Sequence, residues 1–344
     1  MKRTTLRLVL LGIAIGFTIL ALLNLSLIDY GFSQLKGQLH IITASRPIEE
    51  FLKDPAFPDS LKQNLRRVKS IRRFAIDSLG LKENDQYKTL YDQEGKPVLW
   101  LVTASEKFRL KSHTWTFPVI GEVEYKGFFE KSAANREAEK LRRSGLDVSL
   151  GTVGAWSTLG WFDDPLLSRM LERSEGSFAE LLIHEMSHGT VYIPDDTEAS
   201  ENLATFIGEE GAIRYLRSRY GAESPAEKAY RLEREDEQST GVFMLSCARR
   251  LEHLYSGFPK DMPLHEKQKH KMELFEEFAT SFDSLGLNNP QIYSRLRQRL
   301  ADANNTVILA YVRYRSGQNV FGDALLNNGG DLRKLVDSLS SAHQ

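Results

Sequence analysis

The chain has 344 residues, of which 41% are hydrophobic and 26% are charged, which is the usage of an ordinary globular protein and excludes a mostly disordered, collagen-like or multi-spanning one. Lys and Arg total 45 against 46 Asp and Glu, and the net charge of −1 argues against a nucleic-acid-binding protein. The single cysteine, Cys247, excludes an intrachain disulfide and a cysteine-based zinc site, and we expect it to be a buried apolar side chain on a helix.

The first distinct element is an uncharged run at Leu8–Ile28. Its 21 residues would form a helix of about 31 Å, which matches the hydrocarbon core of a bilayer. Lys2, Arg3 and Arg7 precede it, so we expect the N-terminus in the cytoplasm and the rest of the chain outside. The sequence therefore predicts a single-pass membrane anchor in residues 1–30 and one exported domain in residues 31–344.

A cleaved secretory signal peptide is the alternative to this anchor. Leu25–Tyr30 offers no A-x-A cleavage pattern, and no cysteine stands near the start for attachment of a lipid. An uncleaved helix is therefore the prediction.

The predicted secondary structure of the exported part changes along its length. Apolar spacing predicts helices between Phe32 and Leu79, and strands separated by turns between Val98 and Tyr125. A short helix ending at Gly145 and a further strand over residues 148–156 complete one small sheet. Helical patterning then dominates, with its longest pieces at Glu223–Cys247, Leu264–Leu285 and Ile292–Tyr314. The fold class expected is α+β, mainly helical with a small sheet.

An aromatic stretch at Gly154–Ser168 precedes the helical part. Trp156, Trp161 and Phe162 stand before Asp164 and a proline, a pattern typical of a packed corner whose turn the aspartate caps. The same stretch could supply a sheet edge that pairs with an extended peptide substrate. Both interpretations remain open from the sequence.

The strongest chemical signal is the motif H-E-x-x-H at His184–His188, within the run FAELLIHEMSHGTVY. Residues four apart share one face of a helix, so His184 and His188 can bind the same metal ion. Imidazoles suit Zn²⁺, which lowers the pKa of a bound water to about 7. Glu185 lies beside them and is the expected general base. The alternative is a helix that carries two ordinary surface histidines.

A third ligand is expected from the next helix, where Glu198, Glu201, Glu209 and Glu210 are the candidates. Glu201 follows His188 by 13 residues, enough for one turn and the start of a helix, and we assign it as the ligand. Glu198 is the near competitor, although it stands where it could cap that helix. Glu209 or Glu210 could orient a ligand from behind.

A group that stabilises an oxyanion is harder to place. Tyr311 and Tyr314 follow Asn304 and Asn305, and a tyrosine hydroxyl could serve that purpose. Simple packing of this helix on the rest of the domain is the alternative.

Long segments of the chain resemble the bacterial family of predicted aminopeptidases, which is related in pattern to the gluzincins. The similar segments are RPIEEFL at Arg46–Leu52, IRRFAIDSLGL at Ile71–Leu81, HTWTFPVIGEVEYKGFF at His113–Phe129, GAWSTLGWFDDPLLS at Gly154–Ser168, HEMSHGTVY at His184–Tyr192 and SENLATFIGEEGA at Ser200–Ala212. The family typically has N-E-x-F-A after the H-E-x-x-H motif, where this chain reads Ser200-Glu201-Asn202-Leu203-Ala204.

The resemblance implies a zincin-like fold and a bacterial zinc peptidase. The uncharged run and the basic residues before it place this peptidase in the cell membrane, with its catalytic domain expected on the periplasmic side. The expected site has one Zn²⁺ held by His184, His188 and Glu201, with Glu185 as the catalytic residue and a peptide as substrate. A non-catalytic zinc-stabilised binding module and a hydrolase acting on another amide are the alternatives. Glu185 argues against the first, because a structural zinc site needs no base. The sequence identifies no protein partner and does not separate exopeptidase from endopeptidase action.

Overall fold

A computed structural model describes residues 25–118, 121–152, 164–194, 196–313 and 320–342. The predicted anchor at Leu8–Ile28 lies outside the described residues except for its last four positions. Among the helices of the described part, none combines the length and apolar character needed to cross a bilayer.

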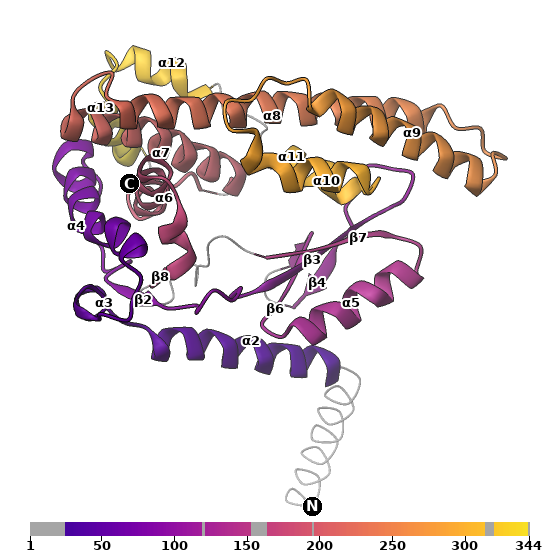
Figure 1. Ribbon diagram of the computed structural model, residues 1–344, viewed down its shortest axis with the longest axis horizontal. Helices are drawn as coiled ribbons and strands as arrows, with labels where there is room; N and C mark the ends of the chain where they lie inside the picture. The colour runs from indigo at the N-terminus through magenta and orange to yellow at the C-terminus, as the bar shows by residue number, and fades with distance from the viewer. Residues whose placement is uncertain (1–24, 119–120, 153–163, 195, 314–319, 343–344) are drawn as a thin grey trace, which may run out of the picture.

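The described chain is mainly helical, with short strands concentrated in its first half (Figure 1). The α-helices are α2 (Leu25–Ala44), α3 (Ile48–Lys53), α4 (Asp59–Leu79), α5 (Lys131–Arg143), α6 (Glu175–His188), α7 (Thr197–Tyr220), α8 (Pro225–Ser256), α9 (Leu264–Phe282), α10 (Ser294–Ala301), α11 (Asn305–Arg313), α12 (Val320–Asn327) and α13 (Leu332–Ala342). The strands are β1 (Arg46–Pro47), β2 (Thr89–Tyr91), β3 (Trp100–Ser105), β4 (Trp115–Phe117), β5 (Gly121–Val123), β6 (Lys126–Phe128), β7 (Asp147–Thr152) and β8 (Leu166–Leu167), and the 3₁₀ helices are η1 (Ser168–Glu172) and η2 (Pro290–Tyr293).

The strands form three small sheets in the described residues, where the sequence predicted one. The sheet β6-β3-β7 is antiparallel, and α5 packs on it through Ala134, Ala138 and Leu141. β4 and β5 form a hairpin of their own, and β1-β2-β8 is the third sheet. In that sheet β2 and β8 are parallel, with Leu90 opposite Leu166, so two segments far apart in the sequence pair with each other. The α+β class was predicted correctly, but the division of the strands was not.

The main core surrounds α6, which packs against α4, α7 and α8 (Figure 1). Phe178, Leu182, Ile183 and Met186 of α6 are completely buried in it. Their spacing turns one side of α6 inward along its length, and a helix so enclosed is a rigid support for its remaining side chains.

A second core lies between α8, α9, α10 and α11. Cys247 is 1% exposed in it, which confirms the expected buried position. The single helix predicted over Ile292–Tyr314 is wrong. α10 ends at Ala301, Ala303 has a φ of 50°, and the Asn304 side chain accepts from the Thr306 amide to start α11. An asparagine side chain that bonds to the backbone in this way competes with the helix and separates α10 from α11.

Candidate metal and catalytic site

Two capped helices position the histidines and glutamates of the sequence motif. The Ser174 hydroxyl accepts from the Ser177 amide at the start of α6, and the Asp196 carboxylate accepts from the Ala199 amide at the start of α7. The buried Ser200 hydroxyl bonds to both the N–H and the C=O of Ile193. These bonds fix the connection between the two helices and the position of the first turn of α7.

Glycines let α7 approach α6 closely. A Cβ at Gly208 would lie 2.9 Å from the Glu180 carbonyl oxygen and 3.1 Å from the Cβ of His184. A Cβ at Gly211 would lie 2.9 Å from the Ile183 side chain. Because a side chain at either position would push the helices apart, glycine determines how near the start of α7 comes to the end of α6.

The structure brings together His184, His188 and Glu201. The two Nε2 atoms are 3.2 Å apart, Glu201 Oε2 lies 3.5 Å from His184 Nε2, and Glu201 Oε1 lies 3.6 Å from His188 Nε2. Two ligand atoms bound tetrahedrally to zinc at about 2.1 Å are about 3.4 Å apart, so these separations fit one zinc ion. The donor set of two imidazoles and one carboxylate also suits it.

Exposure increases across this cluster from one side to the other. The side chains of His184, His188 and Glu201 are 19%, 29% and 55% exposed. The cluster is therefore supported by the core at His184 and open at Glu201, as a site that admits a substrate needs to be.

The charges in the cluster are coupled. Burial would lower the pKa of His184, but its hydrogen bond with Glu201 and the nearby carboxylates raise that pKa overall. Burial and the neighbouring His184 lower the pKa of His188. The hydrogen bond with His184 lowers the pKa of Glu201. The lowered pKa values of Glu201 and His188 favour an ionised carboxylate and a neutral imidazole, which are the forms that bind a metal ion.

Thr205 is a contact of the cluster that the sequence analysis did not identify. Its Oγ1 lies 3.4 Å from His184 Nδ1. When His184 Nε2 offers its lone pair to a metal, Nδ1 carries the proton and donates to this hydroxyl. The signal was available, because Thr205 follows Glu201 by four residues and so lies on the same face of α7.

Glu185 is half-buried next to the cluster and hydrogen-bonds to Tyr87. Burial raises the pKa of Glu185, the positive His184 opposes that rise, and Glu201 and Asp164 add to it. The bond from the Tyr87 hydroxyl lowers it in turn. A carboxylate in these surroundings is a stronger base than an exposed one, which suits proton transfer near neutral pH.

Tyr87 itself is held in a strained conformation. It is 2% exposed and has a φ of 60°, which is uncommon for an aromatic residue. Its amide donates to the Asp164 carbonyl at 2.9 Å, and the guanidinium of Arg72 on α4 binds the carbonyls of Asn84 and Gln86 just before it. The loop is therefore fixed from two sides, with the Tyr87 hydroxyl directed at Glu185.

The other carboxylates proposed from the sequence have different surroundings. Glu198 lies in the first turn of α7 and is not part of the three-ligand cluster found in the described residues. Glu209 pairs with Arg234 of α8, and Glu210 pairs with Arg214 of its own helix. Nδ1 of His184, the ring nitrogen away from Glu201, contacts Thr205 and neither of these acids.

The remaining sequence candidates divide in two. Tyr311 packs on the second core, and Asn305 lies in that region with its Oδ1 accepting from Tyr255. Tyr314 and the segment 153–163, which contains the proposed substrate-pairing edge, lie outside the described residues. Asp164, which directly follows that segment, is buried, and its backbone carbonyl accepts a hydrogen bond from the Tyr87 amide.

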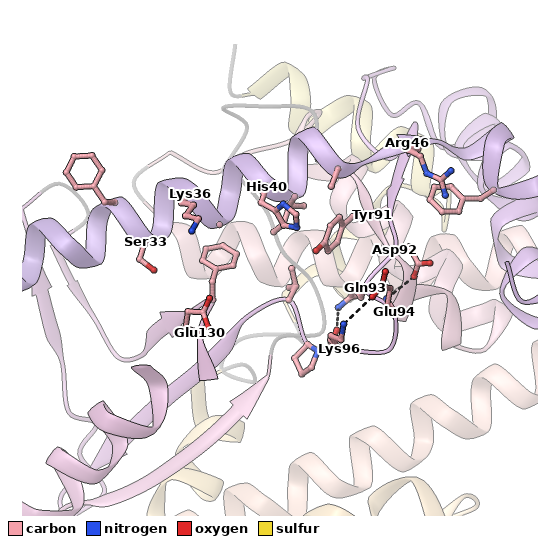
Figure 2. A pocket seen from close by; sticks show the side chains of 18 of the residues that line it. Ser33, Lys36, His40, Arg46, Tyr91, Asp92, Gln93, Glu94, Lys96 and Glu130 are labelled. Atoms are coloured by element: carbon pink, nitrogen blue, oxygen red, sulfur yellow. Dashed lines mark hydrogen bonds and ion pairs between the residues drawn. The ribbon is translucent and has the colours of Figure 1, made fainter. Parts of the chain in front are cut away.

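A cavity of about 870 Å³ lies elsewhere, between α2 and residues 91–98 (Figure 2). Ser33, Lys36 and His40 of α2 face Tyr91 and Lys96 across it. The residues of the candidate site, which are His184, Glu185, His188 and Glu201, do not line it. Charges of both signs line its wall, so it lacks the convergent group of one chemistry that marks the histidine cluster.

The chain was compared with known proteins. Neither a curated protein nor a solved structure matches it. A family model described as "Putative aminopeptidase" matches residues 29–344, which includes the whole cluster and the loop of Tyr87. Because the match spans nearly all of the described fold, the chain belongs to the family of that description.

Proposed function

We propose that the protein is a zinc-dependent peptidase with a zincin-like site, and that it acts as an aminopeptidase. The observation that carries the proposal is the convergence of His184, His188 and Glu201 at the separations of zinc ligands, with Glu185 on the next position of the same helix. The family match supports peptide hydrolysis as the reaction.

In this proposal His184, His188 and Glu201 hold one zinc ion. When bound, zinc supplies a positive charge that polarises the scissile carbonyl and acidifies water. Glu185 takes a proton from the attacking water on its carboxylate oxygen and delivers it to the leaving amine nitrogen. The Tyr87 hydroxyl holds the Glu185 carboxylate in place for both transfers.

The proposed location is the membrane of a bacterial cell, with the catalytic domain on the periplasmic side. The support is the uncharged run Leu8–Ile28 and the basic residues before it. A phosphatase reporter fused to the C-terminus should be active in intact cells. Activity only of a cytoplasmic reporter at that position would contradict the location.

The experiment for the activity uses purified full-length protein in detergent. Peptides with a free amino terminus should be cleaved, removal of zinc by a chelator should stop cleavage, and added zinc should restore it. Matched peptides with an acetylated terminus test the aminopeptidase part, because cleavage of both sets at equal rates would make the protein an endopeptidase. Absence of any cleavage by the zinc-loaded protein would contradict the peptidase and favour a zinc-stabilised binding module.

The ligand assignment has a matched pair of variants. Glu201→Gln should lose most of its zinc, because the amide oxygen is a much weaker ligand than a carboxylate. Glu198→Gln, three residues earlier on the same helix, should keep it. The reverse result would move the ligand role to Glu198.

A further inference from the structure

One face of α2 is bound to the rest of the protein. The Tyr30 hydroxyl and the Gln34 amide both donate to the Gly127 carbonyl, at 2.9 Å and 3.1 Å. A Cβ at Gly37 would lie 2.1 Å from the Phe129 ring, and Ile41 is 1% exposed. At 100° per residue these four positions lie within about 60° of one another around the helix.

The opposite face carries an apolar stripe, which we define as Leu25, Ile28, Phe32, Leu35 and Leu39. These side chains are 38–68% exposed and repeat at intervals of three and four residues. Their mean direction is about 180° from the bound face. They make up five of the fifteen large hydrophobic side chains that are exposed in the described part of the chain. Single exposed apolar residues are ordinary, but a continuous row on one helix marks an interaction surface.

The charges of α2 lie beside the stripe and not in it. Asp29, Lys36 and His40 lie on one flank, where they line the cavity between α2 and residues 91–98, and Phe32 at the edge of the stripe also reaches this cavity. α2 is therefore divided into a bound face, a polar flank and an uncharged outer face. This division is typical of a helix that lies in the plane of a membrane surface.

The sequence before the stripe indicates what covers it. Leu25 and Ile28 are the last apolar residues of the uncharged run that starts at Leu8, and Lys2, Arg3 and Arg7 stand ahead of that run. The first two residues of the stripe therefore belong to the segment with which the chain is proposed to enter a bilayer. No charged residue occurs in that segment before Asp29. A second copy is a weaker candidate, because the stripe would bury roughly 400–500 Å² on each copy against about 800 Å² for a stable dimer.

We propose that the apolar stripe of α2 lies on the surface of a phospholipid bilayer and holds the catalytic domain in a fixed orientation against it. Figure 1 shows α2 along one side of the molecule, with α8 and α9 on the opposite side. The stripe would therefore keep these long helices away from the lipid. This inference builds on the proposed membrane location but not on zinc binding or catalysis.

The test uses the full-length chain in vesicles of phosphatidylcholine with a minority of phosphatidylglycerol. Single cysteines replace Leu35 or Leu39 in the stripe, or Met272 on α9 as the control, since Met272 is an apolar side chain of similar exposure at 55%. Each cysteine carries an environment-sensitive fluorophore, and Cys247 stays unlabelled because it is buried. Lipids that carry a spin label near the headgroup serve as the quencher.

Fluorophores at positions 35 and 39 should be blue-shifted and quenched at least threefold more than the one at position 272. Equal quenching at all three positions in vesicle-bound protein would overturn the proposal, as would failure of the chain to float with the vesicles. Disulfide formation between copies through a cysteine at position 35, without lipid quenching, would show a second copy on the stripe and also overturn it. Because no outcome depends on peptide cleavage, the peptidase proposal stands or fails separately.

Discussion

His184 is contacted at Nδ1 by the neighbouring helix α7. Thr205 Oγ1 lies 3.4 Å from Nδ1, so the ring presents Nε2 to the position between His188 and Glu201. A partner of this kind fixes both the tautomer and the angle of the ring.

We expect Thr205→Val to weaken zinc binding by about 10–100-fold, because valine keeps the shape of threonine and removes the hydroxyl. Competition with a fluorescent zinc chelator measures the affinity. Thr205→Ser retains a hydroxyl and is the control, with affinity close to that of the original protein. An affinity of the valine variant within twofold of the original would show that this contact has no such effect.

Tyr87→Phe should leave zinc content unchanged and lower kcat roughly tenfold, since a hydrogen bond to a charged group contributes about 1.5–3 kcal/mol. The bond from Tyr87 lowers the pKa of Glu185, so its removal raises that pKa. The base then becomes ionised only at higher pH, so the acid limb of the profile of kcat/KM against pH should shift to higher pH. A profile with an unmoved acid limb and unchanged kcat would contradict the positioning role.

At the level of elements, the site depends on how closely α6 and α7 pack. A Cβ added at Gly208 would meet the α6 backbone at Glu180 and the Cβ of His184. The sequence contains the motif H-E-x-x-H followed by Glu201, but spacing along the chain cannot reveal the distance between two helices. Gly208 and Gly211 are the residues that determine it, and their effect is visible only once both helices are placed.

Gly208→Ala should destabilise the protein by about 1–3 kcal/mol despite the better helix propensity of alanine, because its Cβ would contact a backbone oxygen. Zinc affinity should fall with it, since His184 and Glu201 are on the separating helices. Gly31→Ala on α2 is the control, because no atom lies within 4 Å of its added Cβ, and it should be neutral or slightly stabilising. Urea unfolding of both variants makes the comparison. Equal stability of the two would contradict this account of the helix contact.

The convergence of the site residues could be predicted where the pattern lies within one helix or within two consecutive helices. His184 and His188 are four residues apart on one helix, so their convergence followed from helical geometry. Tyr87 was missed because it lies in a loop almost a hundred residues earlier, with no periodic pattern. The parallel pairing of β2 with β8 was missed for the same reason, since strands β3 to β7 and helix α5 lie between the two in the sequence.

At the scale of the whole molecule, a buried polar contact joins the second core to the β6-β3-β7 sheet. Lys271 of α9 is 0% exposed and binds the Asp147 carboxylate of β7 and the Lys107 carbonyl. The Asn305 amide donates to the same carboxylate, so α11 also joins the contact. Burial lowers the pKa of Lys271, and the charge of Asp147 opposes that change. The helical layer is thereby fixed to the β6-β3-β7 sheet.

Lys271→Met should destabilise the protein by about 3–5 kcal/mol, because it leaves Asp147 as a buried charge without its partner. The double variant Lys271→Met, Asp147→Asn should recover part of the loss by removing that charge. Urea unfolding followed by circular dichroism gives both values. A single variant as stable as the original protein would show that the contact does not stabilise the joined cores.

The central claim is that one zinc ion and Glu185 act together, and the most direct test is Glu185→Gln with zinc content and peptide hydrolysis measured on the same purified sample. The amide keeps the volume of the side chain and cannot take a proton. We predict one zinc per chain in both proteins and a loss of about 10²–10⁴-fold in hydrolysis by the variant. A zinc-loaded variant that keeps a tenth or more of the original activity would contradict the assignment of Glu185 as the base.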